Sequence, residues 1–232
     1  MKEKYLQLQP RLQLLADLVP QNARLADIGT DHGYLPVWLL QRGRIDSAIA
    51  ADIGEEPLQH ARRTAEEYGV EGIDFRLCDG LRDLMPGEAD TVIIAGMGGE
   101  TIIHIISAAP WTKKNVTLLL QPMTKAGELR RWLADNGYCF VDERLVWDKD
   151  FLYPVMVLTG GEQPALSEME EEYGVCLHDD PLYGEYLDMQ AARLRRTVEN
   201  MRRSDSETAQ READRLEQRC CALRRMREEI TG

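Results

Sequence analysis

The sequence has 232 residues and a formal net charge of −12; 44% of its residues are hydrophobic, 6% aromatic and 29% charged. This length suits one or two domains that bury a core without disulfides, and the composition is typical of soluble globular proteins rather than of disordered or fibrous chains. No stretch approaches the roughly 20 apolar residues that span a bilayer, and the polar N-terminal segment is unlike a signal peptide. We therefore expect a cytoplasmic protein with no membrane partner.

The cysteines and histidines give no sign of a metal site. The five cysteines are scattered without any C-x-x-C spacing, and the four histidines lie far apart in the sequence. Neither a disulfide framework nor a zinc site follows from such a pattern. We therefore expect no metal ion, and no obligate protein partner is evident.

Charge is divided unevenly along the chain. Residues 1–184 include 17 basic and 30 acidic residues, whereas residues 185–232 include eleven arginines and ten acids. An acidic body followed by an arginine-rich segment is compatible with a nucleic-acid partner, because local basic stripes rather than net charge attract phosphate. The alternative is a solvated helix face whose charges pair with one another.

Helices and strands are predicted to alternate over the first 160 residues. Leucine and valine at helical spacing predict a helix over residues 4–19, which Pro20 ends. Strand-like runs, most of them apolar, predict seven strands, over residues 24–28, 47–53, 73–77, 91–95, 116–120, 140–146 and 154–158. Helical patterns separate most of them, over residues 35–42, 57–68, 100–108 and 127–136. This order predicts an α/β fold with a buried, mostly parallel sheet and a closing hairpin at its edge.

The run GGEQP at residues 160–164 breaks this alternation. We place a domain boundary there, which gives a first domain over residues 1–160 and a helical domain over residues 161–232. Apolar residues spaced alternately by four and three predict two coiled-coil segments, separated by an S-x-x-E capping pattern at residues 204–207. Their seams include Leu187, Leu194, Val198, Leu216 and Leu223. Periodicity does not distinguish an antiparallel hairpin from one long broken helix.

The stretch LADIGTDHGYLP, residues 25–36, is the most informative one. A strand delivers Asp27, Gly29, Asp31 and Gly33 into the start of a helix, where glycines let a ligand approach the backbone and free N–H groups face it. Dinucleotide-binding and S-adenosylmethionine-binding loops share this pattern. Asp31 favours S-adenosylmethionine, because a carboxylate repels a pyrophosphate but tolerates a sulfonium and an amino group.

Further polar residues follow the later strands. Asp52 ends the second strand, where an acid can accept hydrogen bonds from both hydroxyls of a ribose. Asp79 follows the third strand and can accept from an adenine amino group. The fourth strand enters the glycine-rich run AGMGGE at residues 95–100, and the fifth ends in Gln121, whose amide suits the edge of a base. Each acid alone is equally compatible with a cap or a turn, but together with the glycine loop they indicate a nucleoside site.

In five stretches the sequence resembles the bacterial TrmK family: DIGTDHGYLP, AGMGGE, LQPM, ERLVWDKDFLYPVMVL and EYGVCLHDDPLYGEYL. Members of this family are class I methyltransferases that use S-adenosylmethionine to methylate N1 of adenine 22 in tRNA. The resemblance, which spans residues 10–200, implies a Rossmann-like methyltransferase domain with a seven-stranded, mostly parallel sheet, followed by a small α-helical coiled-coil domain. Two positions depart from the family: Gly33, where alanine is more usual, and Asp52, where glutamate is expected.

The loop pattern and this resemblance together imply three groups of site residues. The cofactor-binding residues are Asp27, Gly29, Thr30, Gly33, Asp52, Ile53, Asp79, Gly80, Gly96, Met97 and Gly98. The catalytic residues are Asp31, to stabilise a cationic product, His32, to orient that acid or bind phosphate, and Gln121. The substrate-binding residues are Tyr34 and Tyr153, to stack on a flipped adenine, and Arg195, Arg196, Arg202 and Arg203, to contact tRNA phosphates. Either tyrosine is also compatible with the core, and His32 with an ordinary turn.

Two other functions stay open from the sequence. A nicotinamide-dependent oxidoreductase would share the fold, but Asp31 and the lack of a Tyr-x-x-x-Lys signature disfavour it. A non-catalytic RNA-binding or coiled-coil assembly protein would keep the nucleotide-binding fold as a platform. Thermal stabilisation by S-adenosylmethionine but not by NAD would distinguish a methyltransferase from the oxidoreductase. Methyl transfer to tRNA would distinguish it from the non-catalytic protein.

Overall fold

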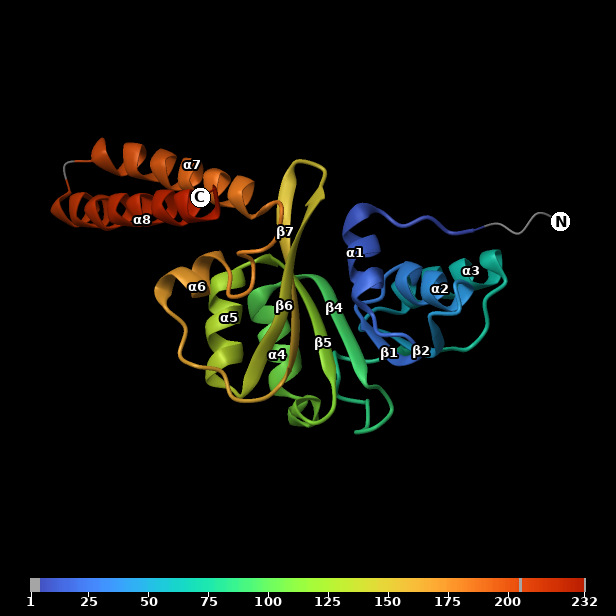
Figure 1. Cartoon of the computed structure of the whole chain (residues 1–232). Helices are drawn as coiled ribbons and strands as arrows, with labels where there is room; N and C mark the ends of the chain where they lie inside the picture. The colour runs from blue at the N-terminus through green and yellow to red at the C-terminus, as the bar shows by residue number, and fades with distance from the viewer. Residues whose placement is uncertain (1–4, 205, 232) are drawn as a thin grey trace. The chain divides into compact units, whose positions relative to one another are not determined.

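The computed structural model describes residues 5–204 and 206–231, and the chain divides into two compact units, Met1–Cys176 and Leu177–Gly232 (Figure 1). The first unit contains α1 (Pro10–Leu18), β1 (Ala23–Ile28), α2 (Tyr34–Gln41), β2 (Ile45–Asp52), α3 (Glu55–Tyr68), β3 (Ile73–Leu77), β4 (Thr91–Gly98), α4 (Gly99–Ser107), the 3-10 helix η1 (Pro110–Lys113), β5 (Thr117–Thr124), α5 (Ala126–Asp135), β6 (Tyr138–Asp148), β7 (Phe151–Gly160) and α6 (Glu168–Tyr173). The second unit contains α7 (Tyr183–Arg202) and α8 (Glu207–Thr231). Among the described helices, none combines the length and the apolar character needed to cross a membrane.

The first unit is built on one seven-stranded sheet with the strand order β3-β2-β1-β4-β5-β7-β6. The strands from β1 to β5 pair in parallel, and the chain order reverses between β1 and β4. β7 pairs antiparallel with β5, and β6 pairs antiparallel with β7, so β7 is enclosed and β6 forms the edge. The predicted α/β fold with a mostly parallel sheet and a closing hairpin is therefore confirmed.

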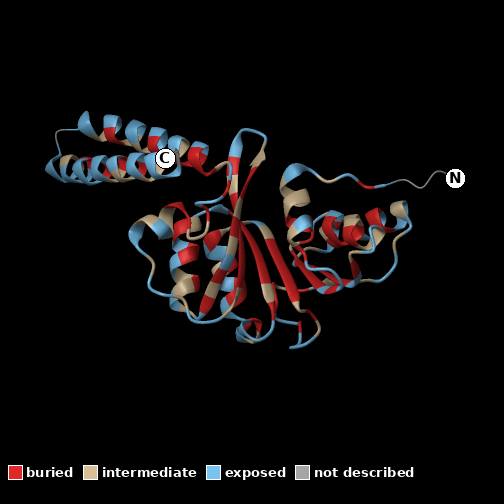
Figure 2. Cartoon of the chain, viewed as in Figure 1, coloured by how far each residue is buried: buried red, intermediate tan, exposed pale blue. Residues whose placement is uncertain are grey.

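Successive residues of the central strands face two separate layers of helices. On one face, Val92 and Ile94 of β4 belong to a cluster with Ile102 of α4 and Leu129 of α5. On the other face, Ile93 lies in a cluster with residues of α1 and α2. Figure 2 shows the central strands buried along most of their length. Because both faces are covered, these strands have continuous apolar sequences, and only their ends are open to a ligand.

The boundary between the units lies after Cys176, beyond the one predicted after Gly160. A buried ion pair explains the difference. Nε of Arg130 on α5 donates to Oε1 of Glu143 on β6 at 2.8 Å, and both side chains are 0% exposed. Oε2 of Glu143 accepts from the backbone N–H of Cys176 at 3.0 Å, and Nη1 of Arg130 donates to the carbonyl of Glu171 at 2.9 Å. Through these bonds the segment after β7, up to Cys176, packs on the sheet and belongs to the first unit.

Helix α6 is absent from the elements that the sequence predicts. It begins with a capping box: Oγ of Ser167 accepts from the N–H of Glu170 at 3.2 Å, and the carboxylate of Glu170 accepts from the N–H of Ser167 at 2.7 Å. The S-x-x-E pattern at these two positions is the signal that could have revealed the helix.

Two predicted helix starts differ from the structure. α1 begins only at Pro10. Proline suits the first position of a helix, because the backbone N–H of that residue has no partner within the helix. α8 begins at Glu207, so Glu207 is the first residue of the helix. In the predicted capping box over residues 204–207, Glu207 would be the third residue of the helix, so the helix starts later than predicted. Residues 1–4 and Asp205, on which these predictions also fall, lie outside the described part of the chain.

α7 and α8 form an antiparallel hairpin, which decides against one long broken helix. Asp188 near the start of α7 pairs with Arg227 near the end of α8 at 3.2 Å, and Arg202 at the end of α7 pairs with Asp214 near the start of α8 at 2.5 Å. Four predicted seam residues are buried: Leu187, Val198, Leu216 and Leu223. Leu194 packs partly buried among them.

Candidate active site

A cavity of about 540 Å³ opens at the carboxyl ends of the strands from β1 to β4. The chain order reverses between β1 and β4, and this is where open α/β sheets bind ligands. Most of the predicted site residues of the first unit line it: Asp27, Gly29, Thr30, Asp31, His32, Tyr34, Asp52, Ile53, Asp79, Gly80, Gly96 and Met97. Sequence reasoning missed several others, among them Arg11, Cys78, Thr101 and His104.

The loop between β1 and α2 brings the backbone to the cavity. Gly29 has φ of +73°, a left-handed conformation that other residues adopt only with strain, so the position favours glycine; a Cβ there would also have to displace the terminal methyl of Met97. Asp31 also has a positive φ, +51°, which aspartate tolerates better than most residues. The predicted cofactor contact of Gly33 stays a prediction. This glycine caps α2, outside the cavity lining, and a Cβ there would stand 2.8 Å from Cβ of Ala61 on α3.

Asp27 is the most buried of the cavity's acids, with an exposure of 5%. Its Oδ2 accepts a hydrogen bond from Oγ1 of Thr30 at 2.7 Å. Burial raises the pKa of Asp27 from 3.8 to about 6; the Thr30 bond opposes this shift and the charge of Asp52 adds to it. A positively charged ligand group at this place would favour the ionised carboxylate, so Asp27 suits a cationic ligand.

Asp52 and Asp79 stand where β2 and β3 end. Oδ1 of Asp52 accepts from the N–H of Gly54 at 2.9 Å, and its Oδ2 accepts from the N–H of Asp31 at 3.3 Å. These bonds hold the carboxylate at the cavity, with lone pairs left to accept from ligand hydroxyls. Asp79 pairs through Oδ2 with Arg82 at 3.0 Å, which orients its carboxylate.

Gln121 lies behind the cavity instead of lining it, which corrects the contact predicted for its amide. The side chain is 0% exposed, and its Oε1 accepts from the N–H of Gly96 at 3.0 Å and from Nη1 of Arg11 at 2.7 Å. Gly96 lies where the register between β4 and β5 shifts, with φ of +77°. In such a bulge the backbone loses its ladder partner, and Gln121 supplies the acceptor instead.

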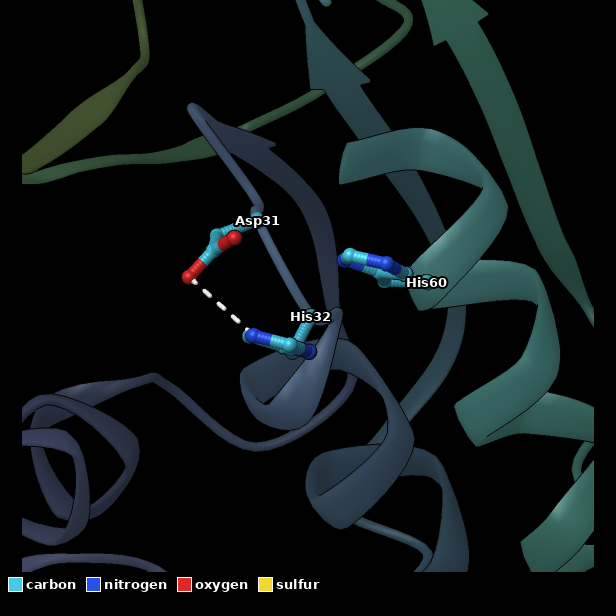
Figure 3. Close-up of side chains that lie close together, drawn as sticks. All are labelled: Asp31, His32 and His60. Carbon is cyan, nitrogen blue, oxygen red and sulfur yellow. Dashed lines mark ion pairs between the residues drawn. The ribbon is translucent and has the colours of Figure 1, made fainter. Parts of the chain in front are cut away.

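Asp31, His32 and His60 lie together beside the cavity (Figure 3). Nε2 of His32 is 3.8 Å from Oδ2 of Asp31. The ring of His32 stacks on His60, with centroids 5.0 Å apart and planes at 6°, and on Tyr34, with centroids 5.1 Å apart and planes at 9°. The three rings form an aromatic stack that ends in the cavity lining at Tyr34.

The same cluster bears on the prediction that the protein holds no metal. Possible ligand atoms of Asp31, His32 and His60 all lie within 4.8 Å of one another. A metal ion binds an imidazole in the plane of its ring, along the nitrogen lone pair. The two histidine rings lie in separate, nearly parallel planes in Figure 3, so as placed they cannot both ligate one ion. The geometry favours the stack, and the absence of a metal stays a prediction.

Two other predicted residues have structural places outside the cavity lining. Tyr153 packs half-buried against the core cluster under α1 and α2, and its ring meets Phe151 at a centroid distance of 6.0 Å. Gly98 is the N-cap of α4, where a Cβ would stand 3.2 Å from Oγ1 of Thr124. Gly98 itself does not line the cavity, although Thr101 and His104 of α4 do.

The four arginines predicted to contact tRNA do not form one group. Arg202 pairs with two acids of α8, Asp214 at 2.5 Å and Glu217 at 2.9 Å. Its charge is therefore compensated inside the hairpin, and its phosphate contact stays a prediction. The other three are exposed and form no ion pair within the described residues: Arg195, Arg196 and Arg203.

Comparisons with known proteins agree with this geometry. A methyltransferase-domain family matches residues 8–156. The tRNA (adenine(22)-N(1))-methyltransferase of Bacillus subtilis (strain 168) is 36% identical over 187 residues, which cover 78% of this chain and 75% of that protein. The crystal structure of the B. subtilis m1A22 tRNA methyltransferase TrmK is similar with a TM-score of 0.84 at 29% identity, covering 95% of this chain and 99% of that one. A Streptococcus pneumoniae protein solved in complex with S-adenosyl-L-methionine gives a TM-score of 0.82 at 32% identity, with the same two coverages of 95% and 99%.

The strand order, the cavity at the reversal of chain order and the matched domain define a class I methyltransferase. At 36% identity over 78% of its length, the chain belongs to the TrmK family. The resemblance predicted from the sequence motifs is thus confirmed, and the nicotinamide-dependent alternative is discarded.

Proposed function

We propose that this protein transfers the methyl group of S-adenosyl-L-methionine to N1 of adenine 22 in tRNA. The observation that carries this function is the cavity of about 540 Å³ at the carboxyl edge of the sheet, lined by four aspartates, in a chain of the TrmK family. Such a lining suits a ligand that carries a sulfonium, an amino group and a ribose.

Three of the aspartates would each bind a different part of the cofactor. Asp52, fixed by two backbone N–H groups, would accept from the ribose hydroxyls. Asp79, just after β3, would accept from the adenine amino group. Asp27 would face the cationic methionine end, and its pKa of about 6 supports this, because the buried carboxylate gains a stabilising charge only when a cation binds.

The reaction requires the alignment of adenine N1 with the methyl carbon and the sulfur, and it requires no proton transfer before the methyl group moves. When bound, S-adenosylmethionine supplies the methyl carbon: the N1 lone pair forms the C–N bond while the C–S bond breaks and its electron pair goes to sulfur. Adenine N1 has a free lone pair, so no residue must first remove a proton. Asp31, whose side chain is 70% exposed, would stabilise the positive charge of the methylated base. Tyr34, held by its stack with His32, would offer a face to the flipped adenine.

The tRNA itself is the expected partner, and a tRNA-modifying enzyme meets its substrate in the cytoplasm. Three exposed arginines would contact its phosphates: Arg195 and Arg196 of α7, and Arg203, which caps the end of this helix. Gln121 would act indirectly, by holding the Gly96 bulge beside the reacting groups.

Transfer of a radiolabelled methyl group to unmodified tRNA, followed by nucleoside analysis, tests the proposal. Label should appear in 1-methyladenosine, and it should disappear with a tRNA that carries guanine at position 22. Label in another nucleoside, or none at all, would overturn the assignment. In a parallel thermal-shift experiment S-adenosylmethionine should raise the melting temperature, whereas NAD should not.

A further inference from the structure

The cavity has a strongly one-sided charge. Four aspartates line it, and among the described residues of its lining Arg11 is the one arginine or lysine. An anionic group that enters this cavity is repelled by the aspartates, and a fixed cation in the lining would offset this repulsion. Both proposed ligands carry such a group: the cofactor has an amino-acid carboxylate, and the target nucleotide has phosphates.

The guanidinium of Arg11 is held in place by two other elements of the same unit. Its Nε donates to Oδ2 of Asp148 at the end of β6 at 3.0 Å, and its Nη1 donates to Oε1 of Gln121 on β5 at 2.7 Å. Arg11 and Asp148 are 20% and 16% exposed in their side chains, so both are largely shielded from solvent. The orientation of the guanidinium is therefore set before any ligand binds.

These two bonds leave part of the guanidinium available. Arginine has five N–H donors in a planar fork, and the described contacts of Arg11 use one at Nε and one at Nη1. The remaining donors belong to a side chain that lines the cavity. A planar fork of N–H groups matches a carboxylate or a phosphate, each of which presents two oxygens.

The guanidinium also lies against the bulge of β4. Nη1 of Arg11 is 3.4 Å from the place where a Cβ on Gly96 would stand. Arg11 therefore lies next to the backbone of Gly96, which also lines the cavity. The bulge, Gln121 and Arg11 form one bonded group at the cavity.

From these contacts we propose that Arg11 is the anion-binding residue of the cavity and holds an oxyanion of a bound ligand. The inference rests on the proposed function for the choice of ligands, and the oxyanion is either the carboxylate of S-adenosylmethionine or a phosphate of the target nucleotide. Asp148 and Gln121 are positioning residues for this contact.

The test compares Arg11→Met with the matched control Arg24→Met. Nε of Arg24 donates to Asp90 at 3.1 Å, the same kind of bond, but Arg24 does not line the active-site cavity. Three quantities are measured: the Kd of S-adenosylmethionine, the Kd of methylthioadenosine, which lacks the amino-acid part, and the KM of tRNA with its salt dependence. The control variant should match the wild-type protein in all three.

The two sources of the oxyanion give different results. If Arg11 holds the carboxylate, Arg11→Met weakens S-adenosylmethionine roughly 10- to 100-fold and leaves methylthioadenosine unchanged. If it holds a phosphate, cofactor binding is unchanged, the KM of tRNA rises by a similar factor, and the salt slope falls by about 0.7–0.9. Unchanged values in every arm, or equal weakening of S-adenosylmethionine and methylthioadenosine, would overturn the proposal.

A second variant covers the case in which Arg11→Met does not fold. Arg11→Lys keeps the charge but lacks the fork, so the same arm should weaken by a smaller factor, roughly 3- to 10-fold. Wild-type values for Arg11→Lys in all arms would count against Arg11. If the wild-type protein methylates no tRNA, the proposed function fails, while the two cofactor arms still decide whether Arg11 binds a carboxylate.

Discussion

The hydroxyl of Thr30 donates a hydrogen bond of 2.7 Å to Asp27, and both residues line the cavity at the end of β1. This bond favours the ionised carboxylate, yet burial dominates and raises the pKa of Asp27 to about 6. The protein without ligand therefore keeps a carboxylate that is costly to ionise. This cost is what a bound cation can relieve.

Asp27→Asn should stabilise the ligand-free protein above pH 6 and weaken its cofactor binding. The folded-state pKa of about 6 exceeds the ordinary value of 3.8, so the contribution of protonated Asp27 to stability is fully present below about pH 4 and is lost as pH rises through about 6. The loss is on the order of 1–3 kcal/mol, and asparagine avoids it while still accepting from Thr30. Thermal unfolding at pH 4 and pH 7.5 measures the difference.

The same titration should appear in ligand binding. Wild-type affinity for S-adenosylmethionine should increase as pH rises through about 6 and then level off, because the cation needs the ionised Asp27. Asp27→Asn should bind more weakly and lack this pH dependence. A variant that kept the wild-type pH profile in calorimetry would show that Asp27 does not face the cation.

Asp52→Ala should lower the affinity for S-adenosylmethionine by about 10- to 100-fold, because two ribose hydroxyls lose their acceptor, at a cost of roughly 1–3 kcal/mol. Asp46→Ala is the matched control, since Asp46 lies on the same strand but is exposed and outside the cavity lining. Calorimetry compares the two variants. An unchanged Kd for Asp52→Ala would remove this residue from the site.

Asp31→Asn should lower kcat far more than it changes the Kd of the cofactor. Asparagine, like aspartate, tolerates the φ of +51° at this position, so the substitution removes the charge with little strain on the loop. Loss of a charge that stabilises the cationic product should lower turnover by a factor on the order of 100. Equal losses in kcat and in cofactor affinity would instead make Asp31 a binding residue only.

The cavity acids could be predicted from the sequence because parallel strands end at a common edge. Asp27, Asp52 and Asp79 each stand at or just after the end of a predicted strand, and parallel pairing brings these ends together. The position of β7 between β5 and β6 could also be predicted from the sequence. Residues 154–158 are continuously apolar, as in a strand covered on both faces, whereas residues 140–146 contain a polar interruption, which suits an edge strand.

Contacts between distant elements could not be predicted in this way. The role of Gln121 depends on the bulge at Gly96, and no local pattern gives the register of two strands that far apart in the sequence. Arg11 reaches Asp148 only because α1 packs beside β6. Such contacts form only in the packed fold, and the local sequence around either residue does not indicate which distant residue it will contact.

The Arg130–Glu143 pair should be important for the stability of the first unit. Glu143→Ala leaves the guanidinium of Arg130 buried without its carboxylate, at a cost of about 3–5 kcal/mol, and frees the backbone N–H of Cys176. Asp142→Ala is the control, because its pair with Arg144 lies at the surface and contributes about 1 kcal/mol or less. Similar melting temperatures for the two variants would contradict the structural role of the buried pair.

Removing three exposed arginines at and near the end of α7 should weaken tRNA binding without changing cofactor affinity. A triple substitution to glutamine at Arg195, Arg196 and Arg203 should reduce the salt slope of tRNA binding by up to about three charges, each scaled by roughly 0.7–0.9. Arg202→Gln is the contrast: its charge is paired with Asp214 and Glu217, so the slope should hardly change while the hairpin becomes less stable. Filter binding at several salt concentrations measures the slopes, and thermal unfolding monitors the hairpin. If the triple variant keeps the wild-type slope, these arginines form only a solvated helix face, and tRNA is held elsewhere.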